Sequence, residues 1–200
     1  MTTNIPQIVG ISGTNGSGKD TFGHVLADEF NFLFISVTDI LREELARRKL
    51  KPERSLMRQL SSEWRKQYGL GVLIDKALEI YNNTPTPHSG LAISSLRNPG
   101  EADRVHGLGG QVVWLDADPL IRYNRIQANA QNRGAIRAVD DQKTFDEFLA
   151  DEQAEMHHQS NDITTLSASG VKAKADIFLE NESNNLESFV KEIKRSLVIN

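Results

Sequence analysis

The sequence predicts an α/β fold built on a parallel sheet, and three observations support this. Five short apolar runs of strand length alternate with segments whose apolar residues recur at helical spacing. The first run, residues 7–12, stops at a glycine-rich turn that leads directly into a helical segment. We find no internal repeat or linker in the 200 residues, which predicts one domain over residues 1–200. The expected architecture has three layers, with helices on both faces of a five-stranded parallel sheet.

The expected elements follow one another in a regular order. Strands are predicted at residues 7–12, 32–37, 91–93, 111–115 and 175–179. Helices are predicted at about residues 19–30, 38–49, 56–68, 72–81, 118–130, 144–156 and 186–197. Thr38 or Asp39 is expected to cap the second helix, and Thr144 with Glu147 forms a capping box. The polar residues 129–143 are expected to lie outside the core.

Composition excludes several classes of function. The chain has 23 basic and 27 acidic residues, a formal net charge of −4, and is therefore not expected to bind nucleic acid. It has no cysteine, which excludes disulfides, thiolate zinc sites and a cysteine nucleophile. Residues 1–6 lack a signal-peptide pattern, and no apolar run reaches the ~20 residues of a membrane span. We therefore expect a cytoplasmic protein without a membrane partner.

A phosphate-binding loop is the strongest motif in the chain. Residues 13–19 match G-x-x-x-x-G-K between a predicted strand and a predicted helix. Glycines allow backbone N–H groups to converge on a phosphate, and the helix N-terminus and the lysine add positive charge. The motif predicts an ATP site made by Gly13, Thr14, Asn15, Gly16, Ser17, Gly18, Lys19, Asp20 and Thr21.

Asp20 departs from the usual pattern, in which Ser or Thr follows the lysine and binds Mg²⁺. Mg²⁺ prefers oxygen ligands, so the Asp20 carboxylate can take this role directly or through water. Alternatively, Asp20 caps the helix and Mg²⁺ is held mainly by the nucleotide.

The Gly18-Lys19-Asp20 sequence resembles small-molecule P-loop kinases such as phage-type deoxynucleotide kinases and animal phosphomevalonate kinases. Residues 34–42 are similar to the adenylate-kinase segment I-S-T-G-D-x-L-R, with Thr38 in place of the glycine. This resemblance implies that Arg42 holds the phosphate of an acceptor. It also implies an acceptor-binding helical part at about residues 38–90.

Three further stretches resemble small-molecule P-loop kinases. Residues 94–101 occupy the place of the D-G-x-x-R segment, which implies that Arg97 is a second acceptor arginine, while Ser94 or Ser95 replaces the usual acid. Residues 114–137 resemble the strand, helix and lid of nucleoside monophosphate kinases, with a lid at about residues 125–143. The implied lid arginines are Arg125, Arg133 and Arg137. Residues 179–183, with Asn181, are similar to the turn that cups the donor base in dephospho-CoA kinases.

Other charged residues are interpreted without a role in the site. We expect Arg122 to be solvated on a polar helix face, and Glu152 and Glu155 to lie on the solvated side of a helix. Glu101 either orients Arg97 or is a surface acid at a helix start.

Three functions remain open. The first is an ATP- and Mg²⁺-dependent nucleoside or deoxynucleoside monophosphate kinase, monomeric or homodimeric, that needs no general base. The second is a dephospho-CoA-kinase-like enzyme or another hydroxyl-acceptor kinase, for which Asp39 is the candidate base. The third is a nucleotide-binding regulatory protein with weak catalysis, suggested by the missing acid at Ser94 and Ser95.

Overall fold

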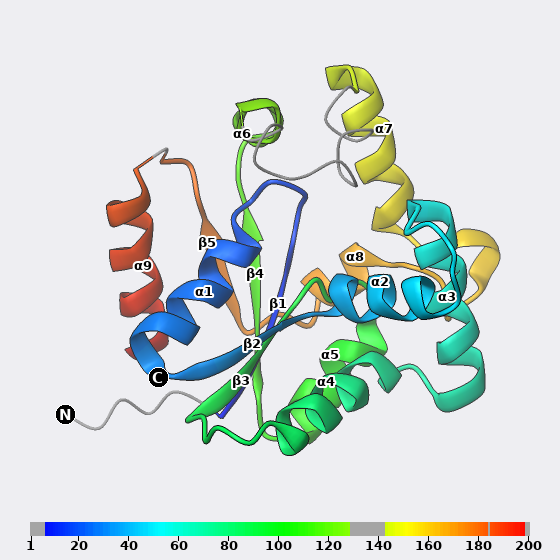
Figure 1. Ribbon diagram of the computed structural model, residues 1–200. Helices are drawn as coiled ribbons and strands as arrows, with labels where there is room; N and C mark the ends of the chain where they lie inside the picture. The colour runs from blue at the N-terminus through cyan, green and yellow to red at the C-terminus, as the bar shows by residue number, and fades with distance from the viewer. Residues whose placement is uncertain (1–6, 129–142, 184, 199–200) are drawn as a thin grey trace.

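A computed structural model describes residues 7–128, 143–183 and 185–198. Five strands form one parallel sheet in the order β2-β3-β1-β4-β5, which confirms the predicted fold class (Figure 1). The strands are β1 (Ile8–Gly13), β2 (Phe32–Ser36), β3 (Gly90–Ser94), β4 (Gln111–Asp116) and β5 (Ile177–Glu180). The register sets Ile11 beside Ser94 on β3 and beside Val113 on β4. The strand that leads into the phosphate loop is therefore the central strand.

Helices cover both faces of this sheet. On one face α1 (Lys19–Phe30) and α9 (Leu186–Val198) bury Phe22 and Phe189 against strand residues such as Val9. The other face carries α2 (Val37–Arg47), α3 (Arg54–Tyr68), α4 (Val72–Asn83), α5 (Pro99–Gly107) and α8 (Ala168–Lys172). Helices α6 (Pro119–Ala128) and α7 (Phe145–Met156) lie beyond the carboxyl ends of the strands (Figure 1). The result is the expected three-layer arrangement.

The observed helix starts agree with the predicted ones in some places and differ in others. Thr144 and Glu147 form the predicted capping box at the start of α7. The expected cap of α2 is wrong: Ser36 is the cap residue, because β2 turns directly into the helix and Thr38 and Asp39 already lie in its first turn. For helix α5 the sequence indicates only one alternative, a helix start near Glu101; the helix begins at Pro99, where Asn98 and Glu101 form a second capping box.

The carboxyl ends of the central strands create the place for a site. Polar residues stand at or just after these ends: the phosphate loop after β1, Ser94 on β3 and Asp116 on β4. In open parallel sheets, ligands bind in the crevice at this edge. Within the described ranges, the chain has no helix long and apolar enough to cross a membrane.

Candidate active site

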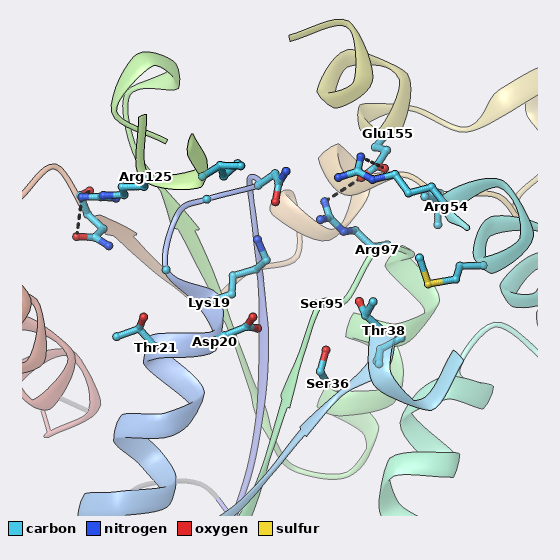
Figure 2. A pocket seen from close by; sticks show the side chains of 18 of the residues that line it. Lys19, Asp20, Thr21, Ser36, Thr38, Arg54, Ser95, Arg97, Arg125 and Glu155 are labelled. Carbon is cyan, nitrogen blue, oxygen red and sulfur yellow. Dashed lines mark hydrogen bonds and ion pairs between the residues drawn. The ribbon is translucent and has the colours of Figure 1, made fainter. Parts of the chain in front are cut away.

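A cleft of about 920 Å³ opens at this edge of the sheet (Figure 2). This volume lies in the range typical of small-ligand sites. One half is lined by the phosphate loop, α6 and the segment after β5; the other half is lined by α2, α3, the β3–α5 turn and α7. We call these the donor half and the acceptor half.

The phosphate loop follows the backbone course that its glycines predict. Gly13 has a φ of +139°, and a Cβ there would lie 2.0 Å from the carbonyl oxygen of Leu115. Gly18 has a φ of +102° and is the cap residue of α1. Both positions therefore require glycine, since an L side chain is strained there and would also collide at Gly13. The loop leads straight into the N-terminus of a helix of 12 residues, as a phosphate site requires.

Lys19 is buried within this loop. Its side chain extends from the first turn of α1, and Nζ donates a hydrogen bond of 2.5 Å to the carbonyl oxygen of Thr14. Burial, and next the positive charge of Arg97, lower the pKa of Lys19 to about 7. An anionic phosphate in the loop would oppose both effects and favour the charged lysine.

Asp116 supports the loop, a contact that the sequence reasoning missed. Thr14 Oγ1 donates a hydrogen bond of 2.7 Å to Asp116 Oδ1, and the backbone N–H of Ala117 donates to the same oxygen. Burial alone would raise the pKa of Asp116, but these hydrogen bonds lower it. The position of an acid directly after an apolar strand was the available signal.

The turn after β5 closes the donor half. Asn181 Nδ2 donates to the carbonyl oxygen of Ser17, so this turn is tied to the phosphate loop. Arg125 Nη2 donates 2.8 Å hydrogen bonds to the carbonyl oxygens of Asn181 and Ser183. Arg125 thus lines the cleft, while the guanidinium contacts this turn (Figure 2). A contact between Arg125 and a transferred phosphate stays a prediction.

Asp20 and Ser94 lie together beside Lys19. Ser94 is fully buried at the end of β3, and its Oγ donates a 3.3 Å hydrogen bond to Asp20 Oδ1. The carboxylate of Asp20 is turned toward the middle of the cleft, whereas Thr21 points to the other side of α1 (Figure 2). The alternative that Asp20 caps the helix is wrong, because Gly18 is the cap residue.

Arginines dominate the acceptor half. Arg42 lines it from α2, and its buried Nε has no hydrogen-bond partner among the described residues. Arg97 reaches it from the β3–α5 turn, on the same side as Arg54 and Arg58 of α3. The two arginines that the resemblance implied are therefore both in one cleft with the phosphate loop. The sequence analysis did not single out Arg54 and Arg58, because arginines near the start of an amphipathic helix usually face water.

Glu155 connects these arginines. Its carboxylate forms ion pairs with Arg97 at 3.4 Å, with Arg54 at 3.5 Å and with Arg58 at 2.7 Å. Burial alone would raise the pKa of Glu155, but the surrounding guanidinium groups, Arg97 first, lower it to about 2. Its side chain is only 13 % exposed, so the expectation of a solvated Glu155 is wrong. Helix α7 turns this carboxylate inward to arginines that come from segments distant in sequence.

Buried charges also fix the backbone of the β3–α5 turn. Glu101 is fully buried and accepts hydrogen bonds from the backbone N–H groups of Arg97 and Asn98. Its other oxygen accepts from the Arg65 guanidinium at 2.7 Å. Glu101 therefore orients the backbone of Arg97 rather than its side chain, and it is not a surface acid.

The expectation that Arg122 is solvated is wrong. The side chain is 2 % exposed rather than solvated, and it forms an ion pair with Glu152, which is itself turned inward on α7. Its guanidinium also donates to the carbonyl oxygens of Ala117 and Asn15. Arg122 thus joins α7 to the phosphate loop.

Of the expected site residues that the structure describes, Asp39 does not line the cleft. It lies in the first turn of α2, 59 % exposed and paired with Arg42 at 2.6 Å. Arg133 and Arg137, with most of the expected lid, lie outside the described residues.

Similarity to known proteins agrees with this geometry. A family model described as an AAA domain matches residues 9–155, from β1 through Glu155. The chain belongs to this AAA-domain family. It is similar to a UPF0200 protein from Pyrobaculum aerophilum, 23 % identical over 194 residues that cover 96 % of this chain and 97 % of the relative. It is also similar to a shikimate kinase from Rhodopirellula baltica, 20 % identical over 192 residues that cover 96 % of this chain and 90 % of that protein.

Among solved structures, a shikimate kinase from Bacteroides thetaiotaomicron matches with a TM-score of 0.60 and 14 % identity. The match covers 95 % of this chain and 97 % of that one. The AAA-domain chain therefore has the P-loop kinase fold that its sequence predicts.

Proposed function

We propose that this protein transfers the γ-phosphate of ATP to a small acceptor that already carries a phosphate, a nucleoside or deoxynucleoside monophosphate. The observation that carries the proposal is the arginine-rich acceptor half, which faces the phosphate loop across one cleft. Guanidinium groups bind phosphate in a bidentate manner, and several of them together favour a dianionic ligand.

The residues of the chain have distinct tasks in this reaction. The loop amides and Lys19 hold the phosphates of ATP, while Arg42 and Arg97 hold and orient the acceptor phosphate. An oxygen of the acceptor phosphate forms a bond to the γ-phosphorus, and the bond from this phosphorus to the bridging oxygen breaks, so that ADP leaves with the electron pair. The acceptor is already ionised at neutral pH, so no general base is needed.

The chemistry of the residues present fits Mg²⁺. The Asp20 carboxylate is an oxygen donor exposed in the cleft beside Lys19, and Mg²⁺ prefers such donors together with phosphate oxygens. When bound, Mg²⁺ supplies positive charge to the phosphate oxygens during transfer.

A hydroxyl-acceptor kinase is the second candidate, and the similarity to shikimate kinases favours it. Such a reaction benefits from a carboxylate that accepts the hydroxyl proton. Asp39, the residue expected in this role, would have to leave Arg42 and turn toward the cleft. A phosphate acceptor requires no such movement of Asp39, and this favours it over a hydroxyl acceptor.

The deciding experiment is a panel of acceptors with ATP and Mg²⁺, read by ADP formation and by the mass of the product. The panel contains ribo- and deoxyribonucleoside monophosphates, dephospho-CoA and shikimate, with Lys19→Ala as the inactive control. We expect transfer to at least one monophosphate, and Asp39→Asn should leave that transfer largely intact. Transfer only to a hydroxyl acceptor, abolished by Asp39→Asn, supports the second candidate. ATP binding without transfer to any acceptor supports a regulatory protein.

A further inference from the structure

We propose that two groups of the magnesium site have exchanged positions in this chain: Asp20 on the phosphate-loop helix is the metal-facing carboxylate, and Ser94 on β3 is the hydroxyl that orients it. The inference rests on the proposed use of ATP, but it concerns how the metal is held and not which acceptor is used. In P-loop nucleotide sites the hydroxyl usually follows the lysine, and an acid from another strand contributes to the metal site. This chain has the carboxylate at the first place and a hydroxyl at the end of the neighbouring strand.

The structure brings the two positions into contact. Ser94 Oγ lies 3.3 Å from Asp20 Oδ1, so a carboxylate and a hydroxyl remain in the same small volume after the exchange. The loss of the acid from β3 is thereby matched by the gain of one on α1. The carboxylate after Lys19 and the serine at the end of β3 are therefore both compatible with a metal site.

The environments of the two residues assign their roles. Ser94 is fully buried in a strand paired on both sides, by β1 and by β2, so its hydroxyl is held in place. Asp20 is exposed to the cleft, and the hydrogen bond from Ser94 engages only Oδ1. The second oxygen, Oδ2, is left to face a cation beside the phosphates. Thr21, the next residue along α1, also lines the cleft, but its side chain points away from Asp20 (Figure 2).

The site is incomplete without the nucleotide. In the described ranges of the chain, no group of three or more His, Cys, Asp or Glu side chains could hold a metal ion alone. Mg²⁺ keeps several waters and commonly binds through one or two carboxylates together with phosphates. We therefore expect the Asp20 pair to bind metal tightly only when a nucleotide occupies the loop.

The test measures metal binding rather than transfer. Mn²⁺ is titrated into the full chain with a non-hydrolysable ATP analogue, and bound metal is followed by electron paramagnetic resonance. Asp20→Ser should weaken Mn²⁺ binding roughly tenfold or more, and the exchanged double variant Asp20→Ser with Ser94→Asp should recover most of it. Asp28→Ser, an exposed position on the same helix, is the matched control and should leave binding unchanged.

Two results would overturn the exchange. One is Mn²⁺ affinity of Asp20→Ser within twofold of the unmodified protein. The other is a folded double variant that binds Mn²⁺ as weakly as Asp20→Ser. If Ser94→Asp prevents folding, Ser94→Ala and Asp20→Asn replace the double variant. Both should weaken Mn²⁺ binding, and unchanged binding in Ser94→Ala would overturn the orienting role. No acceptor is present, so failure of the acceptor panel with intact Mn²⁺ binding rejects only the proposed function.

Discussion

The two halves of the cleft are built in different ways. The donor half is made largely by backbone from one continuous segment, residues 13–21, whose glycines and helix start create the phosphate site locally. The acceptor half is made by side chains from α2, α3, the β3–α5 turn and α7, which meet only in the folded protein. A backbone site needs few particular side chains, whereas a side-chain site depends on each charge having its partner. The difference predicts that a substitution of a residue that touches one ligand acts mainly on the half that binds this ligand.

The largest effect is expected for Lys19→Ala. Loss of the buried ammonium group should lower the transfer rate about 1,000-fold and weaken ATP binding, because this charge stabilises the phosphates during transfer. The measurement is steady-state ADP formation together with calorimetric titration of an ATP analogue. Lys194→Ala, on α9 and paired with Glu29, is the control and should retain full activity. Unchanged ATP affinity in Lys19→Ala would contradict the assignment of the donor half.

Arg42→Ala tests the acceptor half alone. The KM for the acceptor should rise about 10- to 100-fold, as expected for one charge-assisted hydrogen-bonded contact, while the KM for ATP changes little. Arg47→Ala is a matched control, because Arg47 lies on the same helix with a side chain 75 % exposed. An equal rise in both KM values would show that the halves are not separate.

Glu155→Gln should lower stability by about 1–3 kcal/mol, since three arginines lose their shared negative charge. The pKa of Glu155 is about 2 in the folded protein against an ordinary value of 4.5. This stabilisation is therefore fully present above pH 4.5 and is lost as pH falls toward 2. Urea unfolding should show a constant difference in the free energy of unfolding between the two proteins above pH 4.5. This difference should narrow at lower pH. Asp146→Asn, exposed on the same helix, should produce a change of about 0.5 kcal/mol or less.

The smallest effect is a proton taken up on nucleotide binding. Lys19 has a pKa of about 7 in the free protein and is mostly neutral above that pH; a bound polyphosphate favours the charged form. Uptake should approach about one proton at alkaline pH and fall toward zero at acidic pH. Calorimetry in buffers of different ionisation enthalpy measures this proton uptake, and Lys19→Met should abolish the uptake. Equal uptake by this variant would show that the proton belongs to another group.

The same contrast explains what could be predicted from the sequence. The phosphate loop and the capping box at Thr144 depend on residues close together in the chain, and both are found as expected. Arg122 and Glu155 were misjudged because charged residues on amphipathic helices usually face water. Their burial depends on partner charges from other segments, and a local pattern contains no information about such partners.

The short motifs predicted some residues of the cleft correctly and others not. Arg42 and Arg97 were found through short stretches that occur in the right order along the chain, and both line the cleft. Asp39 belongs to one of the same stretches but lies outside the lining, because β2 enters α2 without a loop and the first turn directs this side chain outward. A motif thus predicts which segment is near a ligand more surely than which side chain touches it.

Helix α7 has a consequence for how the two ligands influence each other. Glu152 and Glu155 lie one turn apart; the first pairs with Arg122, which contacts the Asn15 carbonyl, and the second pairs with the acceptor arginines. A shift of this helix changes both sets of contacts at once. We therefore expect a ligand that displaces one of these glutamates to alter the free energy with which the other ligand binds, and thermodynamic reciprocity would make the two influences equal.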